Sequence, residues 1–200
     1  MGMSAWLYIL CMGSLSAMMT PTSANAGQVP QQRASIDQSF DFVPRRPVPA
    51  HVRFCEIYVG QCDIYTDRRP LNRSPRHDLN AAITVNWSVN RAITPVEDGG
   101  FDSWDINVTQ GDCEDFALQK RKELIALGWP THALRLAITR TPRGTVHAVL
   151  LVNINGSDFV LDNLTSRVLR WHETPYEFLI IQDKHDPKAW HDIIIAGLLG

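Results

Sequence analysis

The spacing of hydrophobic positions along the chain changes near residue 130. Over residues 75–93 apolar side chains recur at helical intervals, and over residues 112–127 good helix formers follow one another as far as Gly128. Glycine is a common C-terminal stop of a helix, and Pro95 is unable to continue the earlier pattern. The pattern therefore predicts two helices, over residues 75–93 and 112–127.

After Pro130 the spacing becomes that of extended chain. Short apolar runs occupy residues 133–139, 145–152, 159–161 and 168–171, and the turn-forming sequences TPRG, NING and DNLTS separate them. Helices followed by an antiparallel meander are typical of an α+β fold. We expect the sheet to pack against the second predicted helix.

The first residues differ in character from the rest of the chain. Residues 5–19 are almost purely apolar or small, and a polar stretch then ends in Ala24-Asn25-Ala26. A short apolar run before an Ala-x-Ala sequence is typical of a secretory signal peptide. We expect residues 1–26 to be cleaved and the protein to reach the periplasm. The alternative is an N-terminal membrane anchor, although a membrane span needs about 20 apolar residues.

Composition places the remainder among ordinary globular domains. The 200 residues are 44% hydrophobic and 20% charged with a formal net charge of −2, so we expect no nucleic-acid partner. Residues 27–50 carry four prolines and little to bury, and we expect a flexible lead-in there. Residues 51–200 are then the folded domain.

Export determines which of the four cysteines are able to pair. Cys11 leaves with the signal peptide, and an odd number in an oxidising compartment implies one disulfide and one free thiol. Cys55 and Cys62 are close enough to close a small loop, in a stretch without a helical pattern, so we expect them to be bonded. The alternatives are three unpaired thiols or a zinc site that includes His51, which no Cys-x-x-Cys spacing supports. Cys113 is then the free thiol.

Cys113 stands at the start of the second predicted helix, where unpaired N–H groups and the helix dipole favour a thiolate. A cysteine nucleophile also needs a histidine base and a group that orients the histidine. His147 opens the apolar run HAVLLV and Asp162 follows the apolar run FVL, positions where an ionisable side chain is costly without a purpose. Weaker candidates for the base, without a matched acid on an adjoining strand, are His132, His172 and His185.

Strand register supports the pairing of these two side chains. If the hairpin turns at Asn155-Gly156, His147 faces Leu164, and Asp162 lies one diagonal step away on the same face. A turn one residue earlier sets the histidine and the aspartate directly opposite each other. Either register brings the side chains within about 8 Å. Taken singly, each residue has a structural explanation, as a core cysteine, a core histidine or a turn aspartate.

Four stretches together resemble the bacterial transglutaminase-like cysteine proteinases, which include calcium-dependent periplasmic proteases that release a surface adhesin: GDCEDFALQKRKELIALGWP, HAVLLV, FVLDNLTSRVLRW and TPYEF. The resemblance extends over residues 54–190. It implies a papain-like fold of the transglutaminase type, with Cys113 as the nucleophile, His147 as the general base and acid, and Asp162 as the group that orients the histidine. It also implies a cysteine endopeptidase that cleaves a surface or envelope protein through a thioester.

Three acids surround Cys113 in the sequence, namely Asp112, Glu114 and Asp115. Their charge opposes thiolate formation, yet Asp112 is a good N-cap and acids stabilise a first helical turn. Clustered carboxylates are also the ligands that Ca²⁺ prefers. The resemblance to the adhesin-releasing proteases implies calcium at Asp112 and Glu114, and less directly at Asp115. Capping and calcium binding both stay open.

Several functions share these residues. A transglutaminase or amidase uses the same triad and differs only in the acyl acceptor, and a calcium-responsive binding module would keep the triad without chemistry. The resemblance implies a protein substrate such as a cell-surface adhesin, and a membrane receptor that sequesters the protease. The oxyanion would meet the Cys113 backbone N–H and a second donor, for which Gln110 and Trp104 are candidates by position.

Overall fold

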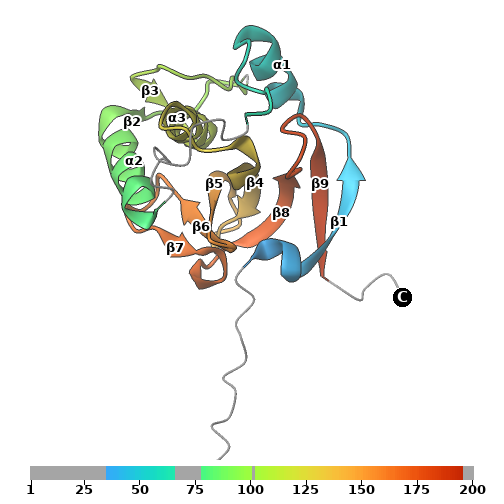
Figure 1. Ribbon diagram of the computed structural model, residues 1–200. Coiled ribbons are helices and arrows are strands. Elements are labelled where there is room, and N and C mark those ends of the chain that lie inside the picture. Colours follow the sequence, from blue (N-terminus) through green and yellow to red (C-terminus); the bar gives the residue numbers. More distant parts are fainter. Residues whose placement is uncertain (1–34, 66–77, 101, 196–200) are drawn as a thin grey trace, which may run out of the picture. The chain divides into compact units, whose positions relative to one another are not determined.

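A seven-stranded sheet is the centre of the fold in the computed structural model, which describes residues 35–65, 78–100 and 102–195. The strands are β1 (Phe40–Arg45), β4 (Leu134–Arg140), β5 (Val146–Ile154), β6 (Ser157–Leu161), β7 (Leu169–Arg170), β8 (Glu177–Gln182) and β9 (Trp190–Ile195). They lie in the order β1-β9-β8-β4-β5-β6-β7, and every pairing is antiparallel (Figure 1). The predicted α+β class is confirmed.

The helices of the described residues are α1 (Pro49–Ile57), α2 (Leu79–Ala92) and α3 (Cys113–Ala126). Asp78 caps α2 because its side chain accepts a hydrogen bond from the backbone N–H of Ala81. Gly128 follows α3 in the left-handed region, with φ of 92°. The strands β2 (Thr94–Pro95) and β3 (Gln110–Gly111) form a parallel pair before α3. The α3 helix packs against β5 and α2 (Figure 1). No helix in the described part of the chain is long and apolar enough to cross a membrane. The predicted signal peptide, residues 1–26, lies outside the described residues.

Both faces of the sheet are covered, which explains why β5 is a nearly continuous apolar run. Leu150 and Val152 belong to the larger core cluster, which includes residues of all three helices. Val149 and Leu151 alternate with them and belong to a second cluster that includes Ile36. Both faces of β5 are therefore apolar, because each lies in a core cluster.

The folded domain begins before residue 51, because the described part of the predicted lead-in joins the sheet. Phe40–Arg45 forms β1, the edge strand that pairs with β9. Before it, Ser35 Oγ and the Ile36 backbone N–H donate to one carboxylate oxygen of Asp158, at 2.7 and 2.8 Å. Asp158 and Ile36 are buried, so this segment covers the second face of the sheet.

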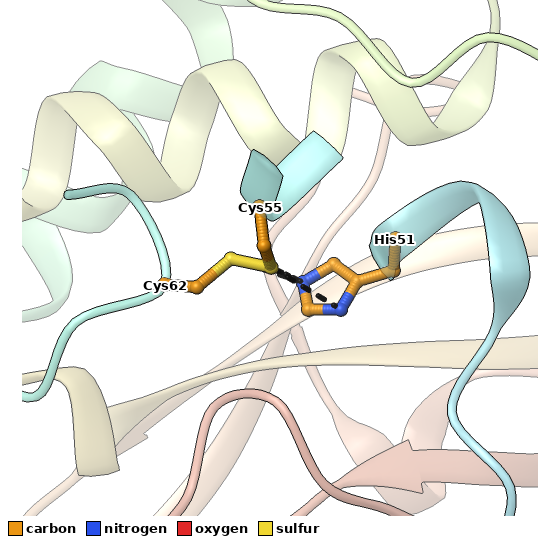
Figure 2. A group of neighbouring side chains, drawn as sticks. All are labelled: His51, Cys55 and Cys62. Carbon is orange, nitrogen blue, oxygen red and sulfur yellow. Dashed lines mark hydrogen bonds between the residues drawn. A yellow bond between two sulfur atoms is a disulfide. The ribbon is translucent and has the colours of Figure 1, made fainter. Parts of the chain in front are cut away.

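Cys55 and Cys62 form the predicted disulfide, which rules out three free thiols (Figure 2). The expectation of no helix there is wrong, since Cys55 lies in α1. His51, one turn earlier, packs against the two sulfur atoms, but bonded sulfurs are not the thiolates that zinc binds. Burial, with a smaller contribution from the charge of Arg121, lowers the pKa of His51 to about 4, so the imidazole is neutral.

Candidate active site

Cys113 is the first residue of α3, where the sequence predicts a helix start. The backbone N–H of Ala148 donates a hydrogen bond to its Sγ at 3.3 Å, and the thiol donates to Oε2 of Glu114 at 3.1 Å. Ala148 follows His147 in β5, so this contact brings the start of α3 beside the predicted base. One backbone hydrogen bond thus joins two segments that are distant in sequence.

His147 and Asp162 form a buried pair. Nε2 of His147 lies 2.8 Å from Oδ1 of Asp162, and the exposed fractions of the two side chains are 5% and 2%. The backbone N–H of Leu164 donates to the same oxygen at 2.9 Å, and the hydroxyl of Tyr176 donates to Oδ2. Each carboxylate oxygen therefore has a donor, as a buried carboxylate requires. The predicted pairing of His147 with Asp162 is confirmed, whereas nothing in the sequence pointed to Tyr176 beyond its place in TPYEF.

The strand register explains this pairing. Leu150 faces Leu161 and Ile154 faces Ser157, which is the register of a turn at Asn155-Gly156. Asn155 and Gly156 have φ of 51° and 81°, the left-handed conformations that such a turn needs. Asp162 comes directly after Leu161, so its side chain reaches the histidine by the predicted diagonal step.

The pKa values of the acid and the thiol move in opposite directions. Burial alone would raise the pKa of Asp162, but hydrogen bonds from His147, Tyr176 and the Leu164 backbone outweigh it and lower this pKa. Burial and then the charge of Glu114 raise the pKa of Cys113, which only the N–H of Ala148 opposes. The aspartate is therefore ionised, and the cysteine holds its proton until a base removes it.

Three carboxylates converge beside Cys113. Ligand atoms of Asp98, Asp112 and Glu114 lie within 4.8 Å of one another. Asp112 occupies the N-cap position of α3, but its side chain makes no capping hydrogen bond. Its Oδ1 is buried, and no described residue donates to it. The capping expected of Asp112 is therefore absent, and Asp98 is a member of the group that the sequence pattern did not reveal.

Burial makes two of these carboxylates, those of Glu114 and Asp112, resist ionisation. It raises the pKa of Glu114 to about 9, with a further contribution from a hydrogen bond with Asp102, and it is also the main cause that raises the pKa of Asp112. Carboxylates in such surroundings remain charged at neutral pH only when a cation compensates them. The donor set of oxygens alone fits a hard cation such as Ca²⁺.

Asp115 lies outside this group. Its Oδ1 accepts a hydrogen bond from the backbone N–H of Asp105 at 2.7 Å. A Cβ added at Gly111 would lie 2.1 Å from Asp115 Oδ2, so only glycine leaves room for this carboxylate. Burial raises the pKa of Asp115 to about 7. Its contacts connect α3 with the loop before it, whereas Asp98 takes the place beside Asp112 and Glu114.

A cavity of about 550 Å³ opens beside these side chains. Cys113, His147 and Tyr176 contribute to its lining, together with the exposed apolar side chains of Val146 and Leu164. This volume lies within the range of about 300–1,000 Å³ that is usual for ligand sites. Trp104, one of the two candidates for the second oxyanion donor, is buried, and its Nε1 donates to Asp102.

The sequence matches the model of a known protein family. The model of the family described as bacterial transglutaminase-like cysteine proteinase BTLCP matches residues 43–196. The chain belongs to this family. As a BTLCP member, it is a transglutaminase-like cysteine peptidase, and its fold is of the α+β class.

Among solved structures, calcium-bound LapG of Legionella pneumophila is 22% identical to this BTLCP protein, with a TM-score of 0.47, over 58% of this chain and 67% of that one. The EGTA-treated LapG of the same organism is 19% identical, with a TM-score of 0.47, over 67% of this chain and 76% of that one. No curated protein matches the sequence.

Proposed function

We propose that the protein is an exported cysteine endopeptidase whose catalytic residues are Cys113, His147 and Asp162. The observation that carries this proposal is that two contacts bring the three residues together beside the cavity. Asp162 holds Nε2 of His147, and the residue after His147 donates its N–H to the sulfur of Cys113. Both Cys113 and His147 line the cavity, where a polypeptide would reach them.

The proposed reaction is acyl transfer to the sulfur. Because Asp162 holds Nε2–H, Nδ1 of His147 is the nitrogen that accepts the thiol proton as Sγ attacks the amide carbonyl carbon. We expect the backbone N–H of Cys113, at the start of α3, to donate to the oxyanion. His147 then gives its proton to the leaving amine, and a thioester forms. Water attacks the thioester with His147 again as base, which releases the acid and restores the thiol.

Calcium is part of the proposal. Asp98, Asp112 and Glu114 would hold the ion, and the buried, unpartnered Oδ1 of Asp112 is the observation that favours it. A bound cation would offset the carboxylate charge beside Cys113 and so lower the pKa of the thiol. Asp115 is a weaker candidate ligand, because its Oδ1 already accepts the Asp105 N–H.

The substrate class follows from the peptidase family. We expect a protein of the cell envelope, and the family resemblance favours a surface adhesin, with the protease in the periplasm and a membrane receptor as its regulator. Cell fractionation tests the location. Most of the protein in the cytosolic fraction would contradict export.

The experiment for the proposed function uses an envelope-protein extract of the source organism. Wild-type protein should generate new N termini, detected by amine labelling and mass spectrometry, and Cys113→Ala should generate none. The matched control is Ser157→Ala, a half-buried residue outside the cavity lining. Cleavage that survives Cys113→Ala would refute the peptidase mechanism. Products that carry an added amine, when a primary amine is supplied, would instead identify amine transfer.

A second experiment tests calcium. Removal of calcium with a chelator should lower the activity and the melting temperature, and Asp112→Asn combined with Glu114→Gln should reproduce the loss of activity. If the chelator changes neither quantity, the acids have only a structural role.

A further inference from the structure

Asp162 lies just beyond the last residue of β6 that pairs with β5. The ladder between β5 and β6 ends at the pair of Leu150 and Leu161, and Asp162 is the next residue. Its backbone N–H and C=O therefore lack partners in this ladder. A group that orients a catalytic histidine needs a fixed position, because misplacement by about 1 Å costs on the order of 10²-fold in rate. Some other element has to hold this residue.

Two asparagines of α2 hold it. Oδ1 of Asn86 accepts the backbone N–H of Asp162 at 3.1 Å, and Nδ2 of Asn90 donates to the backbone C=O of Asp162 at 2.8 Å. Asn86 is completely buried, with an exposed fraction of 0%. The backbone N–H and C=O of Asp162 thus both bond to side chains of one helix. The bonded residues are more than seventy positions apart in the sequence.

The same two amides hold the segment that follows. Nδ2 of Asn86 donates to the carbonyls of Thr165 and Ser166, both at 3.4 Å, and Nδ2 of Asn90 also donates to Thr165 at 3.3 Å. The two asparagines are four residues apart, so they lie on one face of α2. A primary amide has both a donor and an acceptor, which no carboxylate or apolar side chain of this size offers.

The α2 helix connects these contacts with the helix that carries Cys113. This helix also packs against α3, which begins with Cys113. The asparagines therefore relate the position of Asp162 to the helix that carries the sulfur. Without them, Asp162 would depend on the end of β6 and on its own side-chain contacts.

We propose that Asn86 and Asn90 are positioning residues that hold the catalytic acid in register with His147 and the α3 helix. This inference rests on the proposed function, because it gives the two amides a role only through Asp162. Neither side chain lines the cavity. Their effect should appear in the reactivity of the cysteine and in turnover, and not in substrate binding.

The test is a double-mutant cycle on the full chain, read out by the rate at which iodoacetamide alkylates Cys113 between pH 5 and pH 9. Asn90→Ala should lower this rate at pH 7 by about 10- to 100-fold and change its pH profile. In an Asp162→Ala background the same substitution should have no further effect, because the residue that it positions is already gone. Asn86→Leu should behave in the same way, and Asn90→Ala provides the test if Asn86→Leu does not fold.

Asn80→Ala is the matched control, since it removes an exposed asparagine from the same helix. It should leave the alkylation rate unchanged. An equal loss from Asn90→Ala in both backgrounds would reveal general destabilisation and overturn the proposal, as would no loss in either. If Asp162→Ala itself leaves alkylation and cleavage intact, the proposed catalytic triad fails instead, so the two failures are distinguishable.

Discussion

Gly111→Ala is a one-carbon change that tests the packing at the start of α3. The added Cβ would lie 2.1 Å from Oδ2 of Asp115, and ordinary contact begins at 3.4 Å, so these atoms must separate by about 1.3 Å. If the Asp115 carboxylate moves, it loses the hydrogen bond from Asp105 N–H, which costs about 2 kcal/mol. For a chain of this size that loss lowers the melting temperature by about 4–8 °C.

If the Gly111 backbone moves instead, it displaces Cys113, two residues later. A shift near 1 Å then lowers kcat on the order of 10²-fold while the melting temperature changes less. Thermal unfolding and the Cys113 alkylation rate, measured together, distinguish the two responses. Gly99→Ala is the control, because nothing lies within 4 Å of a Cβ at that position. If Gly111→Ala matches Gly99→Ala in both measurements, the Asp115 carboxylate does not restrict residue 111 to glycine.

Three further predictions concern the neighbouring contacts. Replacing both Cys55 and Cys62 with serine opens a loop with a sequence separation of 7 and should lower the free energy of unfolding by about 2 kcal/mol, measured in urea, with the alkylation rate of Cys113 unchanged. Tyr176→Phe removes a donor to the Asp162 carboxylate and should lower kcat by about 10-fold without a matching rise in KM; an unchanged kcat would contradict this. Burial raises the pKa of Glu114 to about 9 from an ordinary 4.5, so the folded state binds the proton more tightly than the unfolded state. In chelator, the melting temperature should therefore fall between pH 5 and pH 9, and added calcium should oppose the fall; a rise would contradict the assignment.

The sequence predicted the parts of the fold that local patterns determine. The long helices and the hairpin at Asn155-Gly156 carry their own capping and turn residues, so their positions agree with the structure within a few residues. That hairpin also specifies the pairing of His147 with Asp162, because register alone decides which side chains share a face.

The sequence did not predict features that depend on distant partners. Phe40–Arg45 lies among prolines and becomes a strand only because β9 supplies its hydrogen bonds. Asp98 joins Asp112 and Glu114 through the path of the loop before α3, which no periodic pattern records. The contacts of Asn86 and Asn90 with the Asp162 backbone depend on how α2 packs, and an asparagine on a helix gives no sign of them beforehand.

In the proposed mechanism, the sulfur of residue 113 reacts through the imidazole of residue 147. The most direct measurement maps, by peptide mass spectrometry, the adduct of a thiol-reactive peptide probe and compares its rate of formation in wild type and His147→Ala. We expect a single adduct, at Cys113, and a rate at pH 7 that falls by about 100-fold or more in the variant. An adduct elsewhere, or an equal rate in both proteins, would contradict it.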